Sequence, residues 1–160
     1  MILFHSGNLV DSTSFWPLTH FGTRKAATAR AHKRCTDSLK KNLPPPATYM
    51  YECEVDLSTC RIIHTDHDWL WPNGLALVVE LFRLKHLPSD DEGVKATRHI
   101  RLGRGDARRE RELCFDLLRD FEIGAISYVN DVEDRGAISY CVINPALITV
   151  LNREELLNCP

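Results

Sequence analysis

Met1-Ile-Leu-Phe4 is a short apolar strand that runs directly into His5-Ser-Gly7, and His20-Phe-Gly-Thr23 follows after a brief loop. The apolar residues after Met1 suit a buried strand, and a glycine two positions beyond His5 lets backbone come close to a bound group. A histidine at a strand end suits hydrogen bonding to a sugar hydroxyl. We expect the rest of the chain to act as scaffold for these two motifs.

The second motif sets two flat rings before the start of a helix. Thr23 is a suitable N-cap for a helix predicted over residues 23–41. A ring, a glycine and a capped helix start together make a floor for a planar heterocycle. Arg24 and Lys25 fall in the first helical turn, where the helix dipole disfavours cations, so they indicate an anion nearby, such as a phosphate.

Each of these features also has a plainer structural interpretation. His5 and His20 are also consistent with ordinary, partly buried histidines, and Arg24 and Lys25 with solvated cations. The basic face of the 23–41 helix suits a phosphate or an acidic partner, and equally a solvated flank. The cluster of two His and two Asp in residues 64–68 invites a metal ion, but no further ligands are indicated, so no metal is predicted.

Composition limits the class of protein. The chain has 160 residues, 44% of them hydrophobic and 26% charged, which predicts one domain over residues 1–160 with a single core. The formal charge of −2 argues against non-specific nucleic-acid binding as the main activity. No uninterrupted apolar stretch of about 18 residues is present, so we expect no membrane span and no signal peptide, and a cytoplasmic protein. The six cysteines lack a C-x-x-C spacing, which predicts reduced thiols.

The remaining pattern predicts a mixed α+β domain. Strands are expected over residues 49–57, 61–64, 125–129, 138–143 and 148–151, with Glu154 and Glu155 closing the chain in solvent. A helix is expected over residues 74–87, capped by Asn73 and buried on more than one side. Another helix is expected from its cap at Asp106 to about Phe121. Trp69, Trp71 and Pro72 suit a plug over the core.

The joint pattern at both ends of the chain resembles the ADP-ribosyltransferase superfamily. The resemblance lies in His5-Ser-Gly7, in His20-Phe-Gly-Thr-Arg-Lys-Ala-Ala27 and in Gly124-Ala-Ile-Ser-Tyr-Val-Asn-Asp-Val-Glu-Asp-Arg-Gly-Ala-Ile-Ser-Tyr-Cys-Val-Ile-Asn-Pro-Ala-Leu-Ile148. Within the superfamily, the chain looks most like the small bacterial and phage-type members of the polymerase and diphtheria-toxin-like branch. The fold that this implies is a split β-sandwich with flanking helices and a nicotinamide cleft between its halves.

The resemblance implies cleavage of NAD+, used as a substrate, between nicotinamide and ribose, with no metal. It assigns His5 to the ribose and His20 to the nicotinamide, in a place where polymerase-like members carry a tyrosine. The residues implied to bind NAD+ are His5, Ser6, Gly7, His20, Phe21, Gly22, Thr23 and Arg24.

The catalytic acid departs from the family pattern. Poly(ADP-ribose) polymerases have a glutamate immediately before the tyrosine of the final strand, and that position here is Ser139. The nearby carboxylates are Asp131, Glu133 and Asp134, in the preceding turn. The resemblance to small members with this Ser-Tyr ending, which take their acid from that turn, makes Glu133 the predicted acid. Asp131, Asp134 and a turn without catalytic function remain alternatives.

Three functions follow as expectations. The first is a mono-ADP-ribosyltransferase that modifies a macromolecule, with a protein expected rather than a nucleic acid, as a toxin, effector or phage-type inhibitor. The second is an NAD glycohydrolase, in which water is the acceptor. The third is a catalytically degenerate binding module, for which the missing glutamate before Tyr140 is the main argument.

Overall fold

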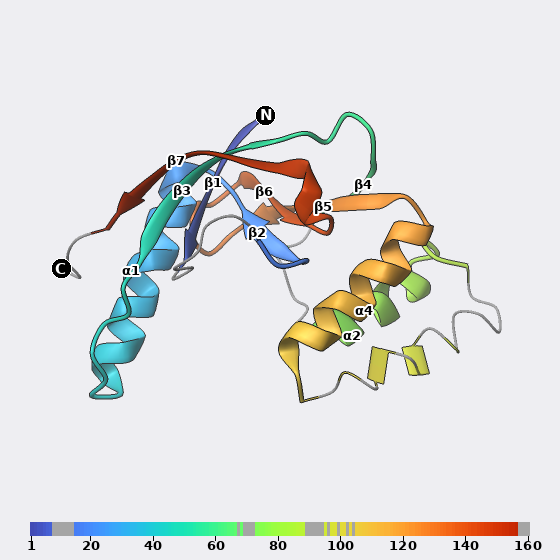
Figure 1. Cartoon of the computed structure of the whole chain (residues 1–160), viewed down its shortest axis with the longest axis horizontal. Helices are drawn as coiled ribbons and strands as arrows, with labels where there is room; N and C mark the ends of the chain where they lie inside the picture. Colours follow the sequence, from blue (N-terminus) through green and yellow to red (C-terminus); the bar gives the residue numbers. More distant parts are fainter. Residues whose placement is uncertain are drawn as a thin grey trace.

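The computed structural model describes residues 1–7, 15–66, 68, 73–88, 95, 97–98, 100–101, 103 and 105–156. Within them the chain forms an α+β fold of two β-sheets and the helices α1, α2 and α4 (Figure 1). None of the helices in this part of the chain is long and apolar enough to cross a membrane.

One sheet joins the beginning, middle and end of the chain. It is antiparallel with strand order β1-β3-β7, built from β1 (Ile2–Gly7), β3 (Tyr49–Val55) and β7 (Ile148–Glu155). Tyr51, Cys53 and Val55 are fully buried, which confirms the predicted core face of β3. β1 continues through Gly7, so His5 lies inside a paired strand, opposite Tyr51, and not beyond a strand end at Phe4 as predicted.

The other sheet has four strands in the order β2-β6-β5-β4. Its strands are β2 (Thr19–Phe21), β6 (Ala137–Val142), β5 (Ile123–Asn130) and β4 (Arg61–Thr65), with β4 parallel to β5 and the other pairs antiparallel. The two sheets meet where Phe4 and Gly22 exchange two backbone hydrogen bonds, each of 2.9 Å. This junction brings the two histidine motifs together.

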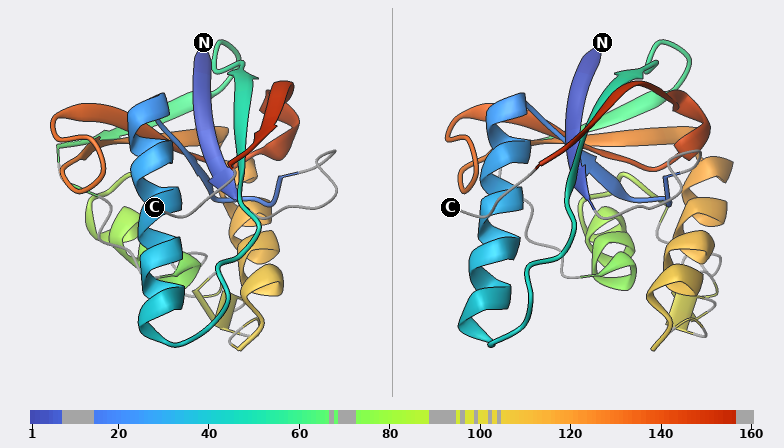
Figure 2. Two further views of the ribbon diagram at one scale, coloured as in Figure 1. Left: turned by 90° about the vertical axis from the view of Figure 1, so that its left-hand side faces the viewer. Right: turned by 60° about the vertical axis from the view of Figure 1, so that its left-hand side comes forward.

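The buried side chains form two clusters. One cluster takes residues from both sheets, among them Leu3, Phe21, Tyr51 and Val142. The other fills the space between the four-stranded sheet and the helices α2 (Gly74–Arg83) and α4 (Ala107–Asp120). The helix α1 (Arg24–Lys40) lies against β1, with three alanines, Ala26, Ala27 and Ala31, buried along its length. Figure 2 shows α1 on one side of the molecule and α2 and α4 on the other.

The predicted helix starts are confirmed by their capping bonds. Thr23 Oγ1 accepts the backbone N–H of Ala26 at 3.0 Å, and Asn73 Oδ1 accepts that of Ala76 at 2.9 Å. Asp106 accepts two backbone N–H groups at the start of α4. Each bond satisfies a donor that the first helical turn leaves unpaired, which is why this local chemistry can be recognised in a sequence.

Two predicted elements differ from the structure. The helix predicted over residues 74–87 ends at Arg83 and is not buried on more than one side, because Val79 and Leu84 are exposed. The tail strand is longer than predicted, since β7 follows the 3-10 turn Pro145–Leu147 and pairs with β3 along its length. Trp69, Trp71 and Pro72, the predicted plug, lie outside the described residues.

Among the residues that the structure describes, the cysteines follow the prediction except at Cys35. Four are free thiols, namely Cys53, Cys60, Cys114 and Cys141. Burial raises the pKa of Cys53 and of Cys114 to about 12, so both remain protonated at neutral pH. Cys35 on α1 is disulfide-bonded, which corrects the prediction for this residue. Cys159 lies outside the described residues.

Candidate active site

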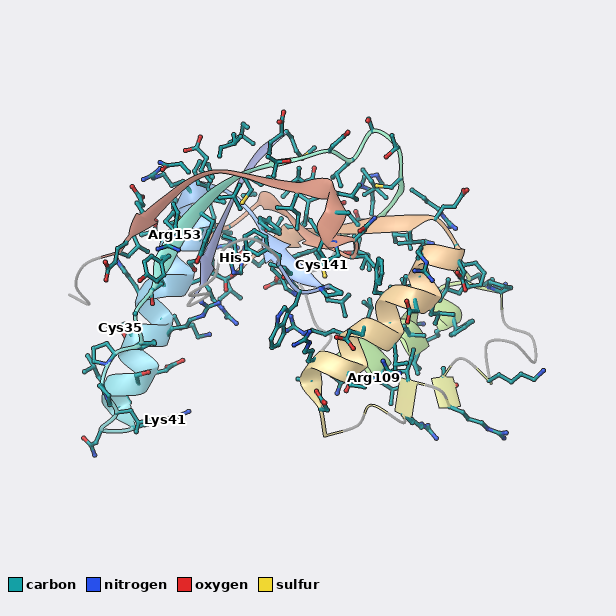
Figure 3. The ribbon with its side chains drawn as sticks, in the orientation of Figure 1. His5, Cys35, Lys41, Arg109, Cys141 and Arg153 are labelled. Atoms are coloured by element: carbon teal, nitrogen blue, oxygen red, sulfur yellow. The ribbon has the colours of Figure 1, made fainter. Side chains whose placement is uncertain are left out.

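A cleft of about 830 Å³ opens beside the junction of the two sheets, with lining residues from α1 and from α4. Its volume is in the range of small-molecule sites. Figure 3 shows His5 between α1 and Arg109 of α4 in this view. Seven of the predicted site residues line the cleft: His5, Ser6, Gly7, His20, Phe21, Gly22 and Glu133.

The imidazole of His5 is fixed in one tautomer. Its Nδ1 donates to the backbone carbonyl of His20 at 2.7 Å, and the ring lies edge-on to Phe15 with 5.5 Å between ring centroids. Burial lowers the pKa of His5 to about 4, and the charges of Arg34 and Arg111 act in the same direction, so the ring is neutral at pH 7. With Nδ1 donating, Nε2 is a free acceptor for a ligand hydroxyl.

The absence of a side chain at Gly7 makes room for the His5 ring. A Cβ added at Gly7 would lie 2.8 Å from His5 Nε2, closer than van der Waals contact allows. We therefore expect Gly7→Ala to displace the imidazole and to lower the unfolding free energy by about 1–3 kcal/mol, as overpacking does. Ser6→Ala is the matched control, because the buried Ser6 hydroxyl has no hydrogen-bond partner among the described residues and its loss should change little. Equal denaturation curves for Gly7→Ala and Ser6→Ala would contradict this account.

His20 stands across the junction, on the other sheet. Its Nδ1 and the hydroxyl of Tyr128 are 2.9 Å apart, and the two rings meet edge to face with centroids 5.6 Å apart. Burial lowers the pKa of His20 to about 3, with the charge of Arg111 as the next cause. Both predicted histidines are therefore neutral rings with fixed orientations, which suits hydrogen bonding and stacking better than proton donation at neutral pH.

These two histidines make stability depend on pH. Because their folded pKa values lie below the unfolded value of about 6.5, the unfolded chain binds more protons between pH 6.5 and about 4. The unfolding free energy should fall on acidification through this window, by up to about 1.4 kcal/mol per pH unit for each histidine. Urea titrations at several pH values test this. His20→Gln should remove one histidine's share of the slope, and an unchanged slope in that variant would exclude His20 as its source.

Glu133 is the carboxylate of the β5–β6 turn that faces the cleft. Its side chain is 18% exposed and its Oε1 lies 3.3 Å from Arg30 Nη1 on α1. The turn itself is held by Asn130, whose Oδ1 accepts the backbone N–H groups of Glu133 at 2.8 Å and of Asp134 at 3.2 Å. Asn130 in turn donates to Ser139 Oγ at 3.1 Å, which anchors the turn to β6.

The other two carboxylates of this turn are placed differently. Asp131 is exposed and is not among the lining residues of the cleft. Asp134 accepts Thr23 Oγ1 at 2.6 Å and pairs with Lys25 Nζ at 2.6 Å, and these bonds lower its pKa. Asp134 thus ties the turn to the start of α1.

Thr23 and Arg24, both predicted to bind the ligand, are not among the lining residues. Thr23 caps α1, and Arg24 pairs with Glu154 of β7 and lies over the ring of Phe4. The anion indicated by the basic first turn is therefore the protein's own, with Glu154 beside Arg24 and Asp134 beside Lys25. Glu154 is thus partly exposed and forms an ion pair, while Glu155 is exposed as predicted.

Besides the predicted site residues, those that line the cleft include Trp16, Arg30, Lys33, Arg34, Asp68, Arg111, Tyr128 and Asn130. Arg30, Lys33 and Arg34 belong to the basic face of the 23–41 helix, which the sequence pattern matches to a phosphate or an acidic partner, or to a solvated flank. Arg30, Lys33 and Arg34 follow helical i, i+3, i+4 spacing, so one face of α1 carries all three cations toward the cleft. Arg34 Nη1 also donates to the carbonyl of Ser6 at 2.7 Å, which holds the end of β1.

No group of three or more metal-ligating side chains occurs among the residues that the structure describes. In the segment with two His and two Asp, His64 Nδ1 and Ser127 Oγ are 2.6 Å apart, so this histidine has a partner on β5. His67 lies outside the described residues.

Comparison of the chain with protein-family models, with curated proteins and with solved structures finds no match. The geometry of the cleft is therefore the basis on which a function can be proposed.

Proposed function

We propose that the protein is an ADP-ribosyltransferase, which cleaves NAD+ at the bond between nicotinamide and ribose and transfers ADP-ribose to a macromolecule. One observation carries the proposal: His5 of the first sheet, His20 of the second and Glu133 of the β5–β6 turn line one cleft of about 830 Å³. Two neutral rings and one carboxylate are what binding and cleavage of a nicotinamide riboside need.

The arrangement of the sheets supports the same family. A three-stranded and a four-stranded sheet meet at the bridge between Phe4 and Gly22, and the cleft lies beside this bridge. A split β-sandwich with its cleft between the halves is the fold that the sequence resemblance implies. We infer that the chain has this fold.

In this proposal the two histidines hold the substrate. Nε2 of His5 accepts a hydrogen bond from a ribose hydroxyl, since Nδ1 is already engaged with the carbonyl of His20. The ring of His20, which is oriented by Tyr128, stacks on the nicotinamide. Lys33 and Arg34 line the α1 side of the cleft and are the cations available for the diphosphate, because neither forms an ion pair with a carboxylate of the described residues.

Glu133 supplies the negative charge for the reaction. As the bond from ribose C1′ to the nicotinamide nitrogen breaks, its electron pair leaves with nicotinamide, and positive charge develops on the ribose. A fixed carboxylate beside C1′ stabilises this charge. The acceptor atom then forms its bond to C1′ and gives its proton to Glu133. Of the three carboxylates in the turn, Glu133 is the one that lines the cleft.

Incubation with NAD+ labelled in its adenylate part, in the presence of cell lysate, tests the proposal. We expect label on a macromolecule and stoichiometric release of nicotinamide. Release of free ADP-ribose alone would identify an NAD glycohydrolase instead. Neither product, from folded protein that also fails to bind NAD+ in calorimetry, would refute both activities.

A further inference from the structure

The α4 side of the cleft contains a cation that the proposed binding of NAD+ does not use. Arg111 is partly buried and lines the cleft, and it takes part in none of the ion pairs found among the described residues. The hydrogen bond found for it there is a long one, 3.5 Å from Nη1 to the carbonyl of Pro17. A guanidinium has five N–H donors, so most of those of Arg111 are open to an anionic ligand.

An exposed indole lines the same cleft. Trp16 is 42% exposed and directly precedes Pro17, whose carbonyl is the one that Arg111 approaches. The Thr19 hydroxyl fixes the backbone here by donating to the Trp16 carbonyl at 2.6 Å, and the guanidinium of Arg108 lies 5.9 Å from the centroid of the Trp16 ring. An exposed indole and an open guanidinium in one cleft match how proteins hold nucleotides of single strands, with the base stacked on the ring and the phosphate on the cation.

Arg111 and the cations of α1 line the cleft from different elements. Arg111 belongs to α4, whereas Arg30, Lys33 and Arg34 belong to α1. NAD+ has one compact diphosphate, for which Lys33 and Arg34 are the cations on the α1 side. Arg111 therefore remains for a second anionic group.

We infer that Trp16 and Arg111 bind a nucleotide of the acceptor, so that the macromolecule which receives ADP-ribose is a single-stranded nucleic acid. The inference rests on the proposed transfer of ADP-ribose. It revises the expectation of a protein acceptor. That expectation agrees with the net charge of −2, which argues against non-specific binding of nucleic acid. Net charge averages over the whole surface, whereas Arg24–Lys40 alone has six cations against one acid, and half of these cations line the cleft together with Arg111.

The test measures binding without NAD+, so it does not depend on turnover. Fluorescence anisotropy with a labelled single strand of about 12 nucleotides, as RNA and as DNA, gives the dissociation constant at low and at physiological ionic strength. We expect Arg111→Glu and Trp16→Ala each to raise this constant about 10-fold or more. Arg119→Glu is the matched control, since it makes the same charge change at the far end of α4, and should have little effect. Calorimetry with NAD+ should give the same affinity for Trp16→Ala as for the wild type.

Four results would overturn the inference. The first is no binding of either strand, and the second is an equal loss of strand affinity in Arg111→Glu and Arg119→Glu. The third is a loss of NAD+ affinity in Trp16→Ala as large as its loss of strand affinity, which would assign the indole to NAD+. The fourth is binding of an acidic peptide in place of the strands, with loss in Arg111→Glu, which would return the acceptor to the protein class. In each case the release of nicotinamide by the wild type still tests the proposed function separately.

Discussion

Replacing Glu133 by glutamine is expected to lower transfer of ADP-ribose about 100-fold or more, while NAD+ affinity and thermal stability stay near those of the wild type. The loss falls on turnover because the carboxylate stabilises charge that moves onto the ribose only as the bond breaks. Stability is spared because the ion pair with Arg30 is long, at 3.3 Å, and the Arg30 side chain is half-exposed, while the backbone bond from Glu133 to Asn130 is retained in the variant. Nicotinamide release, calorimetry with NAD+ and a thermal melt measure the three quantities.

The neighbouring carboxylates provide controls with distinct expected results. Asp131→Asn should behave as the wild type, since this side chain is exposed and away from the cleft lining. Asp134→Asn should lower the melting temperature, because it removes the ion pair with Lys25 and weakens the bond from Thr23. If Glu133→Gln keeps full activity while Asp131→Asn is inactive, the acid has been assigned to the wrong residue. If all three variants remain active, the acid lies outside this turn.

Removing the ring of His5 is expected to raise the dissociation constant for NAD+ about 10-fold or more, or to abolish turnover. His5→Ala loses the Nε2 acceptor and also the bond that Nδ1 donates to the His20 carbonyl, so it affects both sides of the sheet junction. Calorimetry with NAD+ and the rate of nicotinamide release check this. Unchanged binding together with unchanged turnover would remove His5 from the site.

Two variants of His20 distinguish a stacking role of its ring from a hydrogen-bonding role. If its ring works by stacking on nicotinamide, His20→Tyr should be tolerated better than His20→Ala, because tyrosine keeps an aromatic face. The contact with the Tyr128 hydroxyl orients the present ring, so a reduced but measurable affinity is expected for the tyrosine variant. Equal losses in the two variants would count against stacking.

Local chemistry makes part of this fold predictable. The caps at Thr23, Asn73 and Asp106 and the alternation of β3 depend on residues within a few positions of one another, and all four are confirmed. The two histidine motifs are predicted from the sequence, and Glu133 from the family resemblance. Of the nine residues predicted for the site, seven line the cleft, whereas Thr23 and Arg24 do not.

The rest depends on contacts between distant residues. The pattern around Arg24 predicts a phosphate, but Glu154, 130 positions away, supplies the anion. Arg111 lies on the helix that Asp106 caps, and nothing in the nearby sequence shows that it reaches the cleft. Tyr128 lies in the strand predicted over residues 125–129, and Asn130 directly follows that prediction; neither is assigned a role from the sequence. Such residues acquire a role only once β5, β6 and α1 are packed together.

The junction of the two sheets has a thermodynamic consequence. His5 belongs to one sheet and His20 to the other. A ligand that contacts both histidines therefore links the two sheets beside the Phe4–Gly22 bridge. A ligand that binds only the folded chain adds its binding free energy to the stability of that chain, about 2.7 kcal/mol at 100 times its dissociation constant. A bound substrate would therefore stabilise the contact between the two sheets. The protein with substrate bound would resist heat and proteases better than the protein without it.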